Sequence, residues 1–319
     1  MPRPFTLYDF PDYTAANPWQ LETVGEGGKG INVIRQTIWP PPLKIDVLHI
    51  GWEDIFLFQS KSKSHAKEIA ETISNQITSL AETGVKIIWT MHNIKSHSVD
   101  YPEAEKILRD SLLLNASKIV LMSHKHLIMI PEKFREKAVV IPLFVYDVLN
   151  NAQIKNKSKV PTFFKYGAIR QETNSDLYSA ILNYKHANKL VSDERLQSEI
   201  DDGNNVLVKR RFTKLEELYY GSISTFSLFT RKPCLNSGAF NYYLGCRNII
   251  FHTGESLPYI ESPEGFEIFE IQNFDSPEHM VDFSMSAHKN YFQALESFLQ
   301  DRSPERIKNL WAQEVKNLL

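Results

Sequence analysis

The sequence contains very little cysteine. Cys234 and Cys246 are its two cysteines in 319 residues, and neither has another metal-ligating residue at the short spacings typical of zinc sites. Small secreted domains depend on several disulfides, so this chain is not expected to be one of them. The cysteine content therefore predicts a protein of a reducing compartment, which we take to be the cytoplasm.

Long apolar runs are absent as well. No stretch of about 18 apolar residues occurs, and the N-terminal MPRPFTLYDFPDY lacks the uninterrupted apolar segment of a signal peptide. We therefore expect no membrane span. The basic segments 61–67 and 155–159 are expected to be solvated surface, and they leave open a peripheral contact with the inner face of a membrane.

The chain also has no excess of charge of either sign. Its 36 lysines and arginines nearly balance 38 aspartates and glutamates, which gives a net charge of −2. Nucleic-acid binding depends on clustered basic residues that neutralise phosphates, so no nucleic-acid partner is expected. The hydrophobic content of 42% is that of a folded globular protein, and 319 residues suffice for two domains.

Short apolar runs alternate with helical patterns along the first half of the chain. The segment 44–50 is typical of a buried strand, and 64–84 has the apolar spacing of an amphipathic helix. Alternation of strand and helix predicts an α/β domain with a parallel sheet that is covered on both faces. Further strands are expected at 85–91, 118–123 and 138–143, and a further helix at 101–116.

The second half repeats this alternation after a polar, basic linker over 151–160. A strand is expected at 162–169, a helix at 174–190, and a helical tail follows. We therefore predict two α/β domains with a cleft between them. The first spans 1–150, the second spans 161–285, and the tail over 286–319 is helical.

Polar clusters follow several of the predicted strands. Open parallel sheets bind their ligands beyond the carboxyl ends of the strands, so these clusters are the candidate site residues. They are HIGWED (49–54), TMHNIKSH (90–97), KYGAIRQE (165–172), VKRRF (208–212) and CLNSGAF (234–240).

The clusters of the first half combine imidazoles with an indole. His49 is expected to pack structurally at its strand end, and Trp52 either covers the core or offers a flat face to a sugar. His92 and Asn93 come directly after a buried strand, where unsatisfied polar groups are costly. That position favours a binding or catalytic role for the pair, whereas His97 is balanced between a site and a structural role.

The clusters of the second half suit an anion. Arg170 follows a glycine after a strand, and a guanidinium there can bind phosphate oxygens through two hydrogen bonds. Residues 209–211 either contact phosphate or form a solvated charge run. Ser237 and Gly238 lie at the start of a predicted helix, where backbone amides favour negative charge.

In order and spacing, these motifs resemble those of bacterial glycosyltransferases with the GT-B fold, of the polysaccharide-biosynthesis type. The resemblance extends over most of the chain. It implies two Rossmann-like domains that face a central cleft, with a donor and an acceptor side. It also implies that the C-terminal helices over 286–319 pack across the domains and that the last helix returns to the N-terminal one. The segments that carry it are NPWQ (17–20), VLHIGWED (47–54), KIIWTMHNIKSH (86–97), FFKYGAIRQE (163–172) and the stretch 211–260.

The resemblance implies a hexosyltransferase of surface polysaccharide biosynthesis. It would move a sugar from a UDP- or GDP-linked donor, which is a substrate and not a cofactor, to a saccharide or lipid-linked saccharide. No metal or other cofactor is expected, because no Asp-x-Asp motif follows a strand. In the first domain the implied catalytic residues are His92, His97 and Glu53, and Trp52 and Asn93 would lie on the acceptor side.

The second domain would then hold the nucleotide diphosphate. By resemblance, Arg170 and a basic residue of 209–211, Lys209 or Arg211, would neutralise the phosphates as the leaving group departs. Such fixed charges stabilise developing negative charge in a transition state. The backbone amides at Ser237, Gly238 and Ala239 would hold the distal phosphate.

Two features depart from the family pattern. The lysine expected soon after Arg170 is missing, and Lys209 is a candidate substitute. The two glutamates of retaining members are missing from 229–245. Either Ser237 takes that role, or the enzyme inverts with Glu53, Asp54, His92 or His97 as its base, or activity is lost. Two alternatives thus stay open: a non-catalytic relative that binds a nucleotide sugar or partners an active transferase, and a sugar-nucleotide epimerase or hydrolase.

Overall fold

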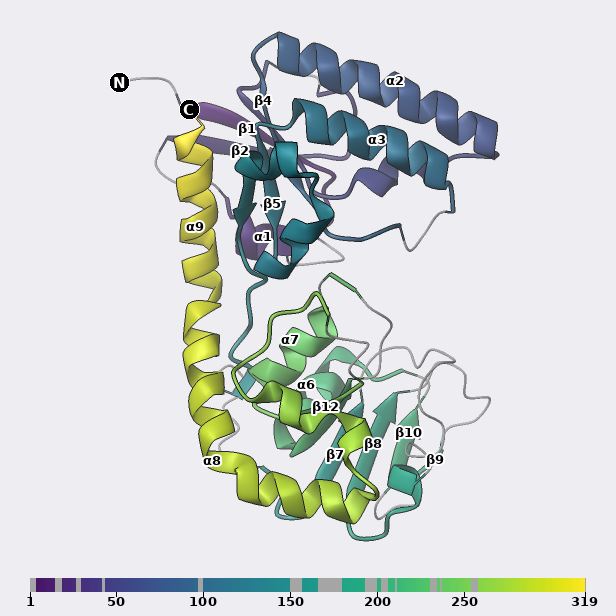
Figure 1. Cartoon of the computed structure of the whole chain (residues 1–319), viewed down its shortest axis with the longest axis vertical. Helices are drawn as coiled ribbons and strands as arrows, with labels where there is room; N and C mark the ends of the chain where they lie inside the picture. Colours follow the sequence, from purple (N-terminus) through teal and green to yellow (C-terminus); the bar gives the residue numbers. More distant parts are fainter. Residues whose placement is uncertain are drawn as a thin grey trace. The chain divides into compact units, whose positions relative to one another are not determined.

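The chain folds into two compact units. The first comprises Met1–Leu143 with Pro304–Leu319, and the second comprises Phe144–Ser303 (Figure 1). The sequence analysis placed its boundaries at 150 and 285. The computed structural model describes residues 4–14, 19–26, 30–41, 44–96, 100–149, 157–165, 180–192, 200–201, 206–209, 211–229, 234–235, 237–253 and 258–318.

One parallel sheet of six strands forms the middle of the first unit, in the order β2-β1-β3-β4-β5-β6. The last four strands correspond to the strands predicted from apolar runs. β1 and β2 are not predicted, because polar residues interrupt their short apolar patterns. The strands are β1 (Phe5–Phe10), β2 (Ile31–Arg35), β3 (Val47–Ile50), β4 (Lys86–Thr90), β5 (Lys118–Leu121) and β6 (Ala138–Val140).

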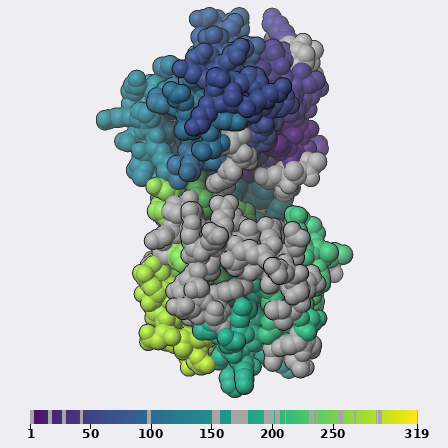
Figure 2. Space-filling view, turned by 90° about the vertical axis from the view of Figure 1, so that its right-hand side faces the viewer, coloured from purple at the N-terminus to yellow at the C-terminus, as the bar shows by residue number. Residues whose placement is uncertain are grey.

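Helices cover this sheet. In α2 (Lys63–Glu82) the Ser62 side chain accepts a hydrogen bond from the His65 amide at 3.2 Å, which caps the helix N-terminus. The helix buries a stripe of alanine and isoleucine and lies beside α3 (Pro102–Asn115). Blue in Figure 2 marks this part of the chain on the surface. The remaining elements are α1 (Trp19–Thr23), α9 (Pro304–Asn317) and the 3-10 helices η1 (Glu53–Leu57), η2 (His124–Met129) and η3 (Glu132–Lys137).

The helix α9 belongs to the first unit although it ends the chain. Its buried residues Ile307, Trp311 and Val315 recur every four residues on one face. It packs against α1, and Lys308 forms an ion pair with Glu22 at 3.0 Å. The preceding helix α8 (Pro277–Asp301) belongs to the second unit.

The second unit has its own six-stranded sheet, in the order β12-β11-β7-β8-β10-β9. All pairings are parallel except that between β9 and β10. The predicted helix over 174–190 is wrong at its end, since 188–192 is a strand that pairs with β7 and β10. Tertiary pairing outweighs the local helical pattern there. The strands are β7 (Thr162–Lys165), β8 (Asn188–Ser192), β9 (Ile200–Asp201), β10 (Val206–Lys209), β11 (Phe226–Phe229) and β12 (Ile249–His252).

Phenylalanine dominates the core of the second unit, where most of its rings are fully buried. α6 (Lys214–Ile223) begins with a capping box in which Thr213 and Glu216 each satisfy a backbone amide. α7 (Gly238–Gly245) follows β11. Among the helices of the described residues, none combines the length and apolar character needed to cross a bilayer. The 3-10 helices of this unit are η5 (Phe266–Phe269) and η6 (Ile271–Asn273).

Candidate functional site

The sheet of the first unit reverses its winding direction beside β1. β2 pairs with one edge of β1 and β3 with the other, and the later strands continue outward from β3. Loops that leave β1 and β3 therefore diverge, and open parallel sheets bind ligands beyond the strand ends at such a point. The predicted site residues Trp52 and His92 follow β3 and β4, close to this reversal.

Three side chains beyond these strand ends form an aromatic cluster, which consists of Trp19, Trp52 and His92. The His92 ring stacks on the Trp52 ring at a centroid distance of 4.2 Å and an angle of 7°. Trp19 meets both rings edge-on, at 4.4 Å from His92 and 5.5 Å from Trp52. The structure thus brings together two residues that the sequence singled out and adds Trp19.

The surroundings of His92 keep its imidazole neutral. The side chain is 5% exposed. Burial, together with the neighbouring His49, lowers the pKa of His92 well below its usual range. At neutral pH the ring therefore carries one ring proton and has one nitrogen lone pair, which are the states a hydrogen-bonding or proton-accepting group requires.

A buried hydrogen-bond network lies behind the aromatic cluster and joins Asp9 of β1, His49 of β3 and Thr90 of β4. The Asp9 carboxylate lies 2.7 Å from His49 Nδ1, and Thr90 Oγ1 lies 2.8 Å from His49 Nε2. All three side chains have no measurable exposure. We call this the Asp9–His49–Thr90 network. His49 was expected to pack structurally, and the structure shows that it does so through two hydrogen bonds.

Asp9 has further partners that the sequence analysis missed. Arg35 Nε donates to its second carboxylate oxygen at 2.8 Å, and Gln20 Nε2 donates at 3.0 Å to the oxygen that faces His49. Trp311 of α9 meets His49 edge-on at 4.7 Å. The available signal was an acidic residue inside the apolar run FTLYDF, since a buried carboxylate needs hydrogen-bond donors.

Glu53, a predicted catalytic residue, is buried and has internal partners. Arg109 Nε donates to one carboxylate oxygen at 2.9 Å, and Trp89 Nε1 lies 3.3 Å from the other. Burial raises the pKa of Glu53, while Arg109 opposes that change. Arg109 also donates to the backbone carbonyls of Asn93, at 3.0 Å, and Ile94. Glu53 thus helps to hold the segment after β4, which includes the half-buried Asn93.

In the second unit the sheet reverses beside β7, which pairs with β8 on one side and β11 on the other. α7 connects β11 to β12, and its N-cap is the buried Ser237, whose hydroxyl accepts from the Phe240 amide at 3.2 Å. The Gly238 and Ala239 amides belong to the first turn, where backbone N–H groups have no partner within the helix. Gly238 is exposed, and a Cβ placed on it would meet no atom within 4 Å.

The predicted basic residues differ in their surroundings. Lys209 ends β10, and its ammonium forms an ion pair with Glu216 at 2.7 Å. That pairing lowers the pKa of Glu216 to about 2, together with the hydrogen bonds of the capping box. Arg211 is exposed. Two other predicted site residues, Arg170 and His97, lie outside the described residues.

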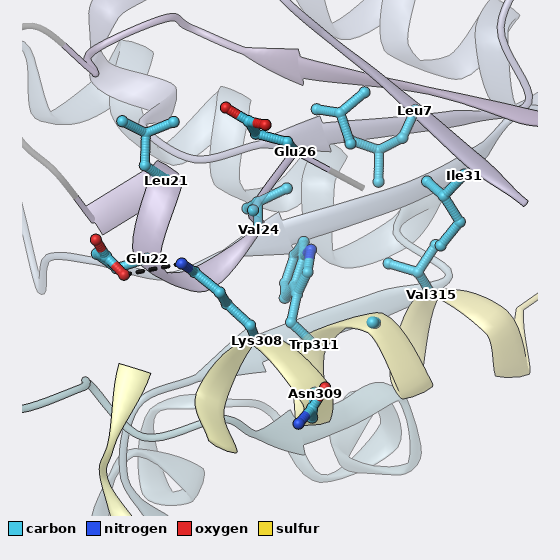
Figure 3. A pocket seen from close by; sticks show the side chains of 13 residues that line it. Leu7, Leu21, Glu22, Val24, Glu26, Ile31, Lys308, Asn309, Trp311 and Val315 are labelled. Atoms are coloured by element: carbon cyan, nitrogen blue, oxygen red, sulfur yellow. Dashed lines mark ion pairs between the residues drawn. The ribbon is translucent and has the colours of Figure 1, made fainter. Parts of the chain in front are cut away.

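A pocket of about 500 Å³ opens elsewhere in the first unit, between α1, β1, β2 and α9. Figure 3 shows Trp311 standing in the middle of its lining residues, with the ion pair between Lys308 and Glu22 at one side. Its remaining walls include Leu7, Val24 and Val315. None of the predicted site residues lines this pocket. Within the described parts of the chain, no three histidine, cysteine, aspartate or glutamate side chains gather as metal ligands would.

No family model matches this sequence, and no curated protein matches it. Solved structures resemble it over its whole length. HepE from Anabaena in complex with UDP is 10% identical, with a TM-score of 0.62 over 98% of this chain and 100% of that chain. HepE has also been crystallised in complex with UDP-glucose.

Two further structures are similar over a comparable share of their chains. Sucrose-phosphate synthase from Thermosynechococcus elongatus is 10% identical, with a TM-score of 0.60 over 99% of both chains. UDP-GlcNAc 2-epimerase from Neisseria meningitidis, bound to UDP-GlcNAc, is 11% identical, with a TM-score of 0.51 over 99% of both chains. At such low identity the likeness is one of fold. It confirms the predicted fold class, an α/β protein with two Rossmann-like domains of the GT-B type.

Proposed function

We propose that this protein is a glycosyltransferase that moves a hexose from a UDP- or GDP-linked donor to a saccharide or lipid-linked saccharide. The observation that carries the proposal is the aromatic cluster, in which an indole and a neutral imidazole lie together beyond the ends of β3 and β4. Indole faces pack well on the apolar faces of sugars, and an imidazole can hydrogen-bond a hydroxyl. HepE, a protein of similar fold, binds UDP and UDP-glucose.

In this proposal the first unit holds the reacting sugar hydroxyls. His92 contacts the transferred sugar, and Trp52 and Asn93 form the acceptor side. Arg109 fixes the Asn93 carbonyl at 3.0 Å and is itself held by Glu53. We therefore give Glu53 a supporting part and prefer His92 or His97 as the group that contacts the acceptor hydroxyl.

The second unit is proposed to bind the nucleotide diphosphate. The amides of Gly238 and Ala239 point from the start of α7, a position that favours anions, and Ser237 fixes that turn. Arg170, Lys209 and Arg211 supply positive charge. Because Lys209 is paired with Glu216, a phosphate group must compete with that carboxylate for its ammonium.

The proposed reaction breaks the bond between the anomeric carbon and a phosphate oxygen and forms one from that carbon to an acceptor oxygen. The acceptor proton passes to a side-chain base if the configuration inverts, or to the departing phosphate if it is retained. Positive charges and amides stabilise the leaving diphosphate, so the proposal needs no metal. With a lipid-linked acceptor, the enzyme would work in the cytoplasm at the inner face of the membrane.

A sugar-nucleotide epimerase or hydrolase is the second candidate. The similarity to UDP-GlcNAc 2-epimerase supports it, because that fold neighbour is an epimerase that binds UDP-GlcNAc. Such an enzyme would consume the donor at the same rate with or without an acceptor. A non-catalytic relative is the third candidate, and the glutamate-free segment 229–245 favours it.

A thermal-shift screen against UDP, GDP, CMP and their sugar conjugates tests the proposal first. A ligand that binds the native state raises the melting temperature by linkage. We expect a shift with one nucleotide series that is reduced in Arg170→Ala and Ser237→Ala and unchanged in Lys185→Ala, an exposed lysine of the second unit. The absence of a shift with every nucleotide would contradict the proposal and favour the non-catalytic candidate.

A transfer assay then separates the two enzymatic candidates. The nucleotide series that shifts the melting temperature is incubated with and without an acceptor saccharide, and release of the nucleotide is followed. Acceptor-dependent release supports the transferase. Equal release in both samples with a free sugar as the product, or conversion of the donor into an epimeric nucleotide sugar without release, would replace it with the second candidate.

A further inference from the structure

The Asp9–His49–Thr90 network has the connectivity of a catalytic triad, in which a carboxylate orients an imidazole that faces a hydroxyl. Its distances, 2.7 and 2.8 Å, are those of strong hydrogen bonds. A nucleophile must reach its substrate, however, and the Thr90 side chain has no exposure. The network therefore acts on the protein itself rather than on a substrate atom.

The part of the protein that it holds is the carboxyl end of β4. Thr90 is the last residue of that strand, and His92 follows two residues later. On one side, the Met91 amide donates to the Val120 carbonyl of β5 at 3.0 Å. On the other side, the hydrogen bond of Thr90 to His49 of β3 ties the same strand end. The exit of β4 toward His92 is thus fixed from both neighbouring strands.

Aromatic contacts link the network directly to His92. Trp19 lies edge-on to His92 at 4.4 Å and contacts the His49 ring at 6.0 Å. Trp311 also packs edge-on against the His49 ring, at 4.7 Å. A turn of the His49 ring would therefore displace Trp19, which forms one wall around His92.

We propose that Asp9 and His49 are positioning residues that hold the end of β4 and the Trp19 indole, and with them His92, in the geometry needed for sugar transfer. This inference rests on the function proposed above. Asp9 orients His49 by accepting its Nδ1 proton, which leaves Nε2 to accept the Thr90 hydroxyl proton. Arg35 and Gln20 hold the buried Asp9 carboxylate in place through hydrogen bonds at 2.8 and 3.0 Å.

Replacement of the Thr90 hydroxyl tests this role with a change of one atom. Thr90→Val keeps the shape and removes the hydrogen bond to His49, whereas Thr90→Ser keeps the hydroxyl. We expect Thr90→Val to lower kcat about tenfold with KM for the donor within about twofold, because small displacements of positioned groups cost rate rather than binding. Thr90→Ser should stay within about threefold of the wild-type kcat.

Thr78 provides a matched control in the same unit. Its hydroxyl donates to the Ser74 carbonyl at 3.0 Å and accepts from Asn115 at 3.1 Å, on a face of α2 remote from the strand ends. Thr78→Val should leave kcat unchanged. A Thr90→Val enzyme with the wild-type kcat would overturn the inference, and so would equal losses in Thr90→Val and Thr90→Ser, since the loss of activity would then not depend on the hydroxyl.

A measurement without turnover keeps this inference separate from the proposed function. In protein labelled with ¹⁵N-histidine, His49 should carry its proton on Nδ1, and Thr90→Val should move the His92 ring signals more than Thr78→Val does. If the wild type transfers no sugar, the proposed function fails while these signals still decide the inference. An unprotonated His49 Nδ1 in the wild type, or unmoved His92 signals in Thr90→Val, would overturn it even if Thr90→Val were inactive or poorly folded.

Discussion

The two units follow one topological plan but use different side chains. Each sheet reverses its winding beside its own first strand, β1 in the first unit and β7 in the second. All five tryptophans lie in the first unit, whereas most of the 19 phenylalanines lie in the second. The ends of β3 and β4 lead to an indole and imidazoles, while β11 leads to the capped amides of α7.

The difference concerns the side chains at the sheet edges. Tryptophan combines a flat apolar face with a polar N–H and suits a surface that must contact a sugar, whereas phenylalanine has no polar atom and serves a core. Under the proposed function, the first unit would bind sugar hydroxyls and the second would bind phosphate through helix-terminal amides and cations. A fold of this kind leaves function to the side chains beyond the strand ends rather than to the strand order that the two sheets share.

Replacement of His92 should give the largest effect, a loss of turnover while nucleotide binding is retained. We expect His92→Asn to lower kcat at least about 100-fold, because general acid–base groups typically contribute two to four powers of ten. Nucleotide binding by the second unit should persist, so the thermal shift with the preferred nucleotide should equal that of the wild type. Rates of nucleotide release and melting temperatures check both parts.

An exposed histidine of the same unit, His124, provides the control, and His124→Asn should behave as the wild type. If His92→Asn abolished the nucleotide shift together with turnover, the proposed division between a sugar side and a phosphate side would be wrong.

A substitution in the second unit should lower the stability of that unit and leave the stability of the first unit unchanged. A Cβ on Gly245 would lie 2.0 Å from the Tyr146 carbonyl oxygen and 3.1 Å from Val148, so Gly245→Ala forces backbone to move. Overpacking of this kind costs about 1–3 kcal/mol of unfolding free energy. A Cβ on Gly238, in the same helix, would meet no atom within 4 Å, so Gly238→Ala should change the free energy of unfolding by less than about 0.5 kcal/mol.

Calorimetry and tryptophan fluorescence distinguish the units in this experiment, because every indole belongs to the first unit. In Gly245→Ala the calorimetric transition should move to lower temperature while the fluorescence midpoint stays. A fluorescence midpoint that moves by the same amount would mean that the two units unfold cooperatively.

Much of the fold follows from the sequence because central strands of a parallel sheet are apolar on both faces. β3 and β4 have that pattern and are found, as are α2 and α3 from their periodicity. β1 and β2 lack it because they contain Asp9 and Arg35. Those charges are tolerated inside the unit only because they pair with each other across 26 residues, a partnership that local patterns do not reveal.

The candidate site likewise contains residues that the sequence points to and residues whose part only the structure shows. Trp52 and His92 are singled out from the sequence because polar or amphipathic residues that directly follow a buried strand are unusual. Trp19, Gln20 and Thr90 lie within quoted motifs but receive no role there, since a helical tryptophan and a strand threonine have ordinary structural roles. Their importance comes from contacts with His49 and His92 at the sheet edge, and these depend on the strand order that the structure supplies.

The smallest expected effect is a difference in how pH changes the stability of the two units. His92 has a lowered pKa, so as pH falls below about 6.5 the unfolded chain takes up a proton that the folded first unit does not. The free energy of unfolding therefore decreases as pH falls below about 6.5, by at most about 1.4 kcal/mol per pH unit. In the second unit burial lowers the pKa of Lys157 to about 8, which favours a rise in stability with pH above about 8, whereas burial raises the pKa of the neighbouring Cys246 to about 12 and opposes that rise above about 8.5.

Denaturant unfolding between pH 5 and 10 measures both slopes, with tryptophan fluorescence for the first unit and far-UV circular dichroism for the whole chain. His92→Asn should flatten the acidic slope of the fluorescence midpoint. Lys157→Met should remove the contribution of Lys157 and leave the opposing one of Cys246, a change seen by dichroism alone. Should both probes share one slope in the wild type, the units unfold together, and the contrast between them would concern the chemistry of their sheet edges and not their stability.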